Sequence, residues 1–572
     1  MIIDGRPDVP FRIATSCPSR PRRLRSESGT PSPSHPTLSL FCYAEVHPIA
    51  MVEYIFSTIP TSFAVGIVVL LIVVLVVRSS RLPLPPGPRG LPIIGNFFDL
   101  PERGDPLPWI AHKNAYGPIS SVRVFGQPII LLNNLQANID LLDKRSSIYS
   151  GRPIFPFAGG MVGWDQQMIL AQYGTHFQTM RKLLKSYLGS PAAVSTFRSI
   201  QELETRYFLA RVLDDPANLN SHIRLTAGAI SLRISHGYTI ETERPDPLVS
   251  LVETAAKDFY VATIPGAWIV DLFPSLRYLP DWLPGTRFKQ VAALFRGHNL
   301  EQTDNPYNFV KRQMLSGNEL PSFTSEMIRN YPDEQTQYAV KFAATAIYGG
   351  GSDPAVAALT TFMLLMILHP DVQHRAQSEL DDVVGTRRLP SFDDRPRLPY
   401  IEAILKEVLR WHTTGRIGIP HRCTQDDIYN GFLIPKDSII LPHMWNITRD
   451  PNLYSDPSKF RPERFLHEEG REPELDPYTY MFGFGRRACP GRDFANANMF
   501  IAIAMTLSVF EIGKKKDENG TEIEPRCEFA GGTVSHPLPF EYSIKPRSSD
   551  AEALIRSVSE EGPRRPSDGS HL

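Results

Sequence analysis

Cysteine and net charge are both scarce in this chain of 572 residues. It has five cysteines, none spaced as C-x-x-C, which argues against a disulfide framework and against a structural zinc site. Its 60 Lys and Arg against 61 Asp and Glu leave a net charge of −1, so no basic field attracts nucleic acid. Because 42% of the residues are hydrophobic, the chain can bury a large core. These balances favour a large globular protein in a reducing compartment.

One long apolar run stands near the start of the chain, where residues 54–77 carry no charge. As a helix these 24 residues would rise about 36 Å, enough to cross a bilayer once. Arg78, Arg81 and Arg89 follow directly, and such cationic flanks stay on the cytoplasmic side of a membrane. The sequence therefore predicts a single-pass anchor with the larger C-terminal part in the cytosol. A cleaved signal peptide or a buried core helix is the alternative.

The segments that flank the anchor and the body lack hydrophobic periodicity. Residues 1–50 are rich in Pro, Ser and Arg, which predicts disorder. Because their arginines compete with the orientation signal of the anchor, we hypothesise that Met51 is the physiological start; abundant native peptides from residues 1–50 would contradict this. Residues 78–96 are Pro-rich and predict a stiff, extended hinge. Residues 547–572 are rich in Ser, Glu and Pro and predict a disordered tail.

Residues 97–546 read as a mainly α-helical body with small β-sheets. Strand-like runs are short and bounded by turns, as in residues 119–132 and 431–442. The longest helical pattern runs from about Asp333 to Leu368, and its second half is apolar on every face, so this helix must be buried. The glycines, Asp353 and Pro354 at its centre would be costly in lipid, which favours a core helix beside a cavity over a second membrane span.

The most informative stretch surrounds Cys489. Gly483, Gly485 and Gly491 allow the backbone to bend tightly around the sulfur and expose N–H groups to it. Arg486 and Arg487 add positive charge. Amide donors, a helix N-terminus and cations all lower a thiol pKa, so we expect a thiolate that can ligate a metal or attack an electrophile. A nucleophile would need a general base, and the loop contains no histidine, although the fold could supply one from elsewhere.

The spacing of this loop resembles a known signature. The pattern F-x-x-G-x-R-x-C-x-G is the haem-ligand signature of the cytochromes P450, and all its fixed positions are present: Phe482, Gly485, Arg487, Cys489 and Gly491. The resemblance implies haem b with Cys489 as its axial thiolate. It also implies that Arg487 pairs with a haem propionate and that Phe482 shields the sulfur. An axial thiolate favours cleavage of the O–O bond of bound dioxygen.

Two further motifs follow the order found in this family. Glu407 and Arg410 stand three residues apart on a predicted helix, close enough to pair. Arg464, in a P-E-R-F segment, comes before the cysteine loop, and the resemblance makes the three a buried structural triad. We expect this triad to hold the haem-binding core and to take no part in the reaction.

Other positions resemble the propionate-binding residues of the family. Arg181 matches the arginine of a helical W-x-x-x-R element, although Phe177 stands where Trp is usual. His421 and Arg422 resemble a further propionate contact. A solvated helix residue is the alternative for Arg181.

The long central helix departs from the family pattern A/G-G-x-D/E-T. This chain reads Gly350, Gly351, Ser352, Asp353 and then Pro354, so the threonine that helps to deliver protons to bound oxygen is absent. Proline offers neither a hydroxyl nor an N–H, which leaves the carbonyl of Gly350 without its helical partner. A water held by that carbonyl and Asp353, or a hydroxyl of the substrate, could substitute. Gly350, Ser352 and Asp353 are therefore the candidate catalytic residues.

The resemblance implies one large cytochrome P450 domain behind an N-terminal transmembrane helix. It implies a monooxygenase of the endoplasmic reticulum membrane that oxidises an apolar organic substrate with O2, using electrons from an NADPH-cytochrome P450 reductase, with cytochrome b5 as a further donor. Likeness to fungal members suggests secondary metabolism. The alternatives are an isomerase, dehydratase or peroxygenase of the same family, and a catalytically degenerate haem-binding protein. A cysteine hydrolase lacks any supporting base or oxyanion motif.

Overall fold

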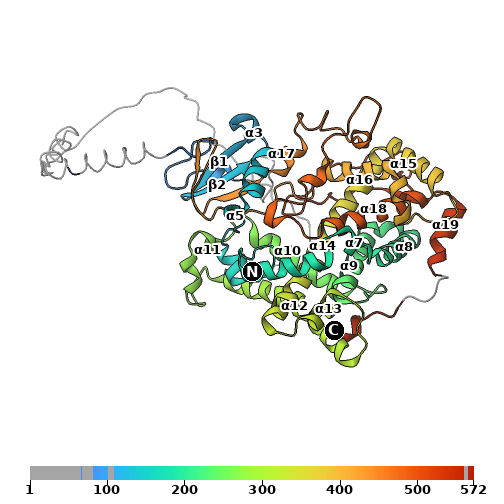
Figure 1. The fold of residues 1–572 in the computed structure, drawn as a ribbon, viewed down its shortest axis with the longest axis horizontal. Helices are drawn as coiled ribbons and strands as arrows, with labels where there is room; N and C mark the ends of the chain where they lie inside the picture. Colours follow the sequence, from blue (N-terminus) through green and yellow to red (C-terminus); the bar gives the residue numbers. More distant parts are fainter. Residues whose placement is uncertain (1–65, 67–81, 101–108, 560–564) are drawn as a thin grey trace, which may run out of the picture. The chain divides into compact units, whose positions relative to one another are not determined.

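The computed structural model describes residue 66 and residues 82–100, 109–559 and 565–572 (Figure 1). The predicted anchor lies outside the described residues except for Gly66. Residues 1–50 and the proposed start at Met51 also lie outside them.

Helices make up most of the described body, as the sequence predicts. Those of the first half are α3 Ala111–Tyr116, α4 Leu135–Asn138, α5 Ser146–Tyr149, α6 Thr175–Leu188, α7 Pro191–Ser195, α8 Arg198–Asp214, α9 Leu219–His236, α10 Pro247–Thr263 and α11 Ile269–Leu272. Those of the second half are α12 Arg287–Ser316, α13 Phe323–Asn330, α14 Glu334–Leu368, α15 Pro370–Val383, α16 Pro399–Trp411, α17 Met444–Thr448, α18 Arg492–Val509 and α19 Ser549–Arg556. Two π-helical segments, η4 Ile139–Lys144 and η5 Pro156–Met161, lie among the early helices.

The β-strands form small sheets, and β1 and β2 lie beside α3 at one side of the helical body (Figure 1). The largest has the order β1-β2-β6-β3, from Ile119–Val124, Gln127–Leu132, Ile439–Pro442 and His421–Arg422. In it β1 pairs antiparallel with β2, and β2 pairs parallel with β6. Two hairpin-like pairs complete the set: β4 Asp427–Tyr429 with β5 Phe432–Ile434, and β7 Phe510–Gly513 with β8 Ser543–Pro546. Both predicted strand regions are confirmed.

The long helix α14 is the centre of the core. Asp333 caps its first turn, where the carboxylate accepts the N–H of Thr336 at 2.8 Å. By length and composition alone this helix could cross a membrane, but 61% of its most apolar stretch is buried inside the protein. It packs against α6, α9 and α18 and passes through Pro354 without ending. The sequence prediction of a buried core helix from about Asp333 to Leu368 is therefore confirmed.

The described part of the Pro-rich segment belongs to the domain. The carbonyls of Pro85 and Pro86 accept hydrogen bonds from the hydroxyl and the N–H of Ser121 in β1, at 2.6 and 2.8 Å. The carbonyl of Pro83 accepts the N–H of Leu433. Residues 82–96 thus lie against the sheets instead of forming a free spacer before them.

The expectation of a disordered tail from residue 547 is wrong for the described residues. Ser548 caps α19 by accepting the N–H of Ala551, and the side chains of Ala551, Ile555 and Val558 are buried. This helix packs against α8 and α18. Burial of a short amphipathic face supplies the order that the polar composition did not suggest.

Candidate functional site

The cysteine loop joins a 3-10 turn, Gly485–Arg487, to the first turn of α18. The N–H of Cys489 donates to the carbonyl of Phe482 at 2.7 Å, which closes the loop on itself. Gly491 precedes α18, and its N–H forms a hydrogen bond with the Cys489 sulfur. Gly485 has a φ of +52°, and a Cβ there would stand 2.4 Å from the carbonyl oxygen of Leu142. Only glycine fits at that position, because the loop lies so close to η4.

Cys489 combines an exposed side chain with a densely enclosed position. Burial raises the pKa of its thiol, whereas the N–H of Gly491 and the cations Arg181 and Arg492 act in the opposite direction. The predicted net lowering by Arg486 and Arg487 is therefore wrong for the protein alone. Arg486 instead lies over the ring of Tyr173. The side chain is exposed just before α18, and a metal coordinated there would deprotonate the thiol.

Arg487 stands two residues before Cys489, and only part of its guanidinium forms hydrogen bonds with described residues. Its Nε donates to the carbonyl of Ser150 at 2.9 Å and its Nη2 to that of Ala171 at 2.7 Å, while the buried Nη1 has no partner among the described residues. The guanidinium stands 3.8 Å from the ring centre of Phe177. Burial, followed by repulsion from Arg181, lowers the pKa of Arg487 to about 10. Such a cation is suited to an anionic ligand.

Two further buried arginines accompany Arg487. Arg181, from α6, donates to the carbonyl of Ala488 at 2.6 Å, and burial lowers its pKa while the Cys489 sulfur raises it. Arg152 donates to the carbonyls of Ile169, Ile419 and Pro420, and burial together with Arg487 lowers its pKa. The sequence analysis missed Arg152, because an arginine in an irregular segment carries no periodic or motif signal.

The structure separates the neighbouring residues His421 and Arg422. The Nδ1 of the buried His421 lies 2.7 Å from the carbonyl of Tyr149, and burial, followed by Arg152, lowers the pKa of His421. Arg422 instead contacts Asp437 and Gln172, each at 3.2 Å. Because successive residues of a strand point to opposite faces, only one of the two can face the arginine group. Arg422 points toward Asp437, and its contact with a propionate stays a prediction.

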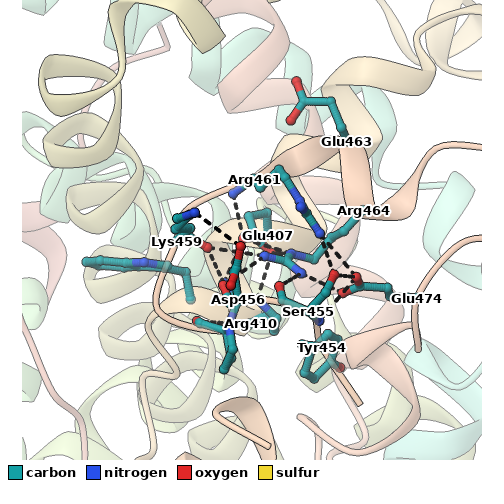
Figure 2. Close-up of polar contacts among 12 residues, drawn as sticks. Glu407, Arg410, Tyr454, Ser455, Asp456, Lys459, Arg461, Glu463, Arg464 and Glu474 are labelled. Atoms are coloured by element: carbon teal, nitrogen blue, oxygen red, sulfur yellow. Dashed lines mark hydrogen bonds and ion pairs between the residues drawn. The ribbon is translucent and has the colours of Figure 1, made fainter. Parts of the chain in front are cut away.

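The predicted triad is assembled in the interior (Figure 2). Two nitrogens of Arg410 donate to the two oxygens of Glu407 at 2.6 and 2.7 Å, and Arg464 approaches the same carboxylate to 3.2 Å. All three side chains are 0% exposed. Arg464 also pairs with Glu474 at 2.5 Å, a partner that the sequence analysis missed.

Backbone carbonyls complete this cluster. Arg410 donates to the carbonyls of Thr448, Pro457 and Lys459, and Arg464 to that of Ser455. Glu463, although next to Arg464, points away from the cluster (Figure 2) and pairs with Arg375. The cluster therefore fastens α16 to residues 448–474, which lead into the cysteine loop.

The central turn of α14 is open where its flanks are packed. A Cβ at Gly349 or Gly350 would meet no atom within 4 Å, and Gly350 is exposed. The next residue, Gly351, faces Ser231 and Phe494, so a Cβ there would lie 3.8 Å from the Phe494 ring. Phe494 belongs to the first turns of α18, and α14 therefore crosses close to the cysteine loop.

The other candidate residues of α14 turn toward α9 and α10. The hydroxyl of Ser352 donates to the carbonyl of Tyr348 at 2.9 Å. The Asp353 carboxylate lies 3.0 Å from His536 and 3.8 Å from Arg224. Ser352 and Asp353 line a small cavity of about 30 Å³ between α9, α10 and α14. The structure thus places Gly350 on the open side of α14 and these two side chains on another side.

Comparison with known proteins agrees with this geometry. The family model described as Cytochrome P450 matches residues 85–544, and the chain therefore belongs to the cytochrome P450 family. It is a haem-thiolate monooxygenase, an oxidoreductase that uses O2 and reductase-derived electrons.

Several of its relatives are fungal proteins. Cytochrome P450 monooxygenase claR of Ampulloclitocybe clavipes is 58% identical over 513 residues, which cover 90% of this chain and 95% of the relative. Cytochrome P450 monooxygenase 208 of Postia placenta is 43% identical, covering 88% of this chain and 99% of its own length. O-methylsterigmatocystin oxidoreductase of Aspergillus flavus is 38% identical, and the match covers 86% of this chain and 94% of the relative.

Proposed function

We propose that Cys489 is the axial ligand of haem b in this protein and that the enzyme oxidises an apolar organic substrate. The observation that carries the assignment is the sulfur itself, exposed in an enclosed position at the start of α18. Haem bound there supplies dioxygen activation, which an axial thiolate promotes. The N–H of Gly491 tunes the electron density of the sulfur through its hydrogen bond.

The buried cations fit the two propionates of haem. Burial lowers the pKa of Arg152, Arg181 and Arg487. Repulsion from Arg487 adds to this effect on Arg152, and repulsion from Arg181 adds to it on Arg487. The Nη1 of Arg487, which has no partner among the described residues, can donate to a carboxylate. We assign propionate binding to Arg181, Arg487 and His421, with Arg152 as a further buried cation near Arg487. Phe482, whose carbonyl accepts the Cys489 N–H, covers the sulfur from the other side.

The open turn of α14 gives room for oxygen and substrate. Gly349 and Gly350 present no side chain there, and Pro354 leaves the Gly350 carbonyl free to hold a water. A cavity of about 30 Å³ is large enough for a water molecule, so Asp353 can exchange a proton with water on the α9 and α10 side. We propose that Asp353 and a water held by the Gly350 carbonyl deliver protons in place of the absent threonine, while Ser352, bound to Tyr348, positions the turn.

The surface supports a membrane-associated enzyme. Leu91, Ile93 and Phe98 are exposed on the segment that follows the predicted anchor, and Phe273, Tyr278 and Trp282 are exposed on a second loop. A Cβ at Gly266, near the start of that loop, would lie 3.8 Å from Phe97, so the two apolar segments are neighbours. An apolar patch of this kind suits a lipid surface. We propose the endoplasmic reticulum membrane, an NADPH-cytochrome P450 reductase as electron donor, and cytochrome b5 as a further donor.

Pro354 keeps a second function in view. An isomerase, dehydratase or peroxygenase needs no delivery of protons to dioxygen from a threonine, so the substitution is also compatible with those reactions. Product formation that depends on NADPH and a reductase supports the monooxygenase. Equal product formation without them supports the second function.

The assignment of the ligand is tested by Cys489→Ser in the membrane-extracted protein. The reduced, carbon-monoxide-treated parent should show the red-shifted Soret band of a thiolate-ligated haem, and the variant should lose it. Cys527→Ser, which changes another exposed cysteine, is the matched control and should keep the band. A variant at Cys489 that retains the parent band contradicts the assignment.

A further inference from the structure

The last eight residues of the chain, Arg565–Leu572, pack back onto the protein. Figure 1 places the end of the chain beside α12, far from α19. These residues and α19 lie beyond the part matched by the family model, which ends at residue 544.

The first anchoring point is the connection between α9 and α10. The N–H of Thr239 donates to the Asp568 carboxylate at 2.8 Å, and the N–H of Asp568 donates back to the carbonyl of Thr239 at 2.9 Å. One bond of the pair uses the side chain of Asp568 and the other its backbone N–H, so both hold residue 568 against Thr239.

The same segment touches the cap of α10. A Cβ at Gly569 would lie 3.5 Å from the hydroxyl of Tyr238, which donates to Asp246 at 2.9 Å. Asp246 caps α10 by accepting the N–H groups of Leu248 and Val249. Gly569 thus lies against the hydroxyl of Tyr238, which contacts the residue that caps α10.

The second anchoring point is α12. Arg312 donates to the carbonyl of His571 at 2.9 Å. Between the two points, Arg565 and Asp568 help to enclose a cavity of about 10 Å³ lined also by His236 of α9 and Phe309 of α12. One short segment therefore bridges the end of α9, the start of α10 and the second half of α12.

Helices α10 and α12 cover the middle of α14. They pack on each other, and Val252 and Glu253 of α10 face Ser352 and Asp353 across the cavity between α9, α10 and α14. Movement of α10 and α12 away from α9 and α14 would open that cavity. Such a movement must stretch or release the contacts of residues 565–572.

We propose that Arg565–Leu572 is a strap that holds α10 and α12 closed over α14 and so slows the entry and release of ligands. Its effect on ligands rests on the proposed haem site, whereas its effect on the motion of α10 and α12 does not. The strap acts as a brake on opening and leaves the closed site unchanged. It therefore alters exchange rates more than affinity.

The test uses the full haem-loaded chain and three variants. One ends after Arg564 and lacks the strap, and Asp568→Ala removes only the acceptor for Thr239. Asp568→Asn keeps an acceptor oxygen and should restore the parent behaviour. Asp550→Ala, an exposed residue of α19 outside the strap, is the control. Hydrogen exchange is followed in residues 237–247 and 305–318, and clotrimazole binding is followed through the Soret band.

Without the strap, exchange in both segments should accelerate about tenfold, as expected when two or three hydrogen bonds that hold a closed state are lost. Exchange in α16 should not change. The association and dissociation rates of clotrimazole should rise together, with little change in Kd, and Asp568→Ala should show a smaller effect of the same kind. Should the truncated chain fail to fold, Asp568→Ala against Asp568→Asn decides.

Unchanged exchange in residues 237–247 overturns the strap. Faster exchange with unchanged clotrimazole rates overturns its role in ligand entry. A parent protein whose Soret band does not respond to clotrimazole would instead contradict the proposed haem site, and the hydrogen-exchange comparison would still decide the strap.

Discussion

The two sides of the candidate haem site are built on opposite plans. On the side of Cys489, Glu407, Arg410 and Arg464 are fully buried, and their carboxylate and guanidinium groups are matched with one another and with backbone carbonyls. On the side of α14, Gly349 and Gly350 border open space, and Asp353 is shared by His536 and Arg224 at longer distances. The first side follows the family pattern closely, and the second departs from it at Pro354.

This difference separates support from adaptation. A buried ion cluster tolerates little change, because loss of one partner leaves an uncompensated charge in the interior. An open turn bordered by glycine tolerates change, because no packed neighbour or matched charge has to be replaced. The side that holds the cofactor is therefore constrained, and the side that meets oxygen and substrate can vary.

The largest expected effect breaks the supporting side. Glu407→Ala leaves Arg410 and Arg464 without their shared carboxylate, and we expect a loss of about 3–5 kcal/mol in the free energy of unfolding. Glu463→Ala removes a carboxylate of the same segment that pairs with Arg375 and accepts the hydroxyl of Tyr400, and its cost should be smaller, about 1–2 kcal/mol. Denaturant unfolding and haem content measure both. Similar losses in the two variants would contradict the comparison.

The contact between Asp271 of α11 and Phe157 of η5 should depend on pH. Asp271, in α11, accepts the N–H of Phe157 at 2.8 Å, and burial raises its pKa to about 6 from the ordinary value of 3.8. A carboxyl whose folded pKa is raised binds more protons when folded, so stability falls as pH rises from about 4 to 6. We expect this group to remove about 1–3 kcal/mol over that range.

Asp271→Asn keeps the acceptor for Phe157 and lacks the titrating proton. Its melting temperature should therefore exceed that of the parent above pH 6 and approach it near pH 4. Asp165→Asn, which changes an exposed carboxylate, is the control and should follow the parent. Parallel profiles of melting temperature against pH for the parent and Asp271→Asn would show that Asp271 contributes no such dependence.

A third comparison is between two arginines, Arg487 and Arg422. Arg487→Gln removes a buried guanidinium with a free Nη1, and we expect haem to dissociate about tenfold faster, as for a lost hydrogen bond to a charged group. Arg422→Gln changes a residue directed at Asp437 and should leave the rate nearly unchanged. Transfer of haem to apomyoglobin measures both rates. An equal acceleration in the two variants would place Arg422 at the cofactor after all.

The smallest expected effect concerns Pro354. If Asp353 and a water held by the Gly350 carbonyl deliver protons less well than a threonine, Pro354→Thr should raise the amount of product per NADPH consumed severalfold. Pro354→Ala restores the backbone N–H without a hydroxyl and separates the two causes. Product and NADPH are measured together under turnover. An unchanged ratio in Pro354→Thr would mean that this position takes no part in proton delivery.

The sequence predicts the features that depend on local spacing. The cysteine loop, the pairing of Glu407 with Arg410 and the burial of α14 all follow from patterns within one segment. The direction of Arg422 was also predictable from the alternation of a strand, had the segment been recognised as one. Arg152, Glu474 and the segment 565–572 could not be found in this way. Their contacts join parts of the chain that are far apart and share no periodic signal.

The buried triad also has a consequence for how the chain is made. Arg410 leaves the ribosome with its partner Glu407 in the same helix, but Arg464 and Glu474 follow only 54 and 64 residues later. At 5–20 residues per second, the last of these appears roughly three to thirteen seconds after Arg410. During that interval the pair of Glu407 and Arg410 lacks Arg464 and the carbonyls that complete it in the folded protein. The core around Glu407 can therefore close only after the residues that lead into the cysteine loop have been synthesised.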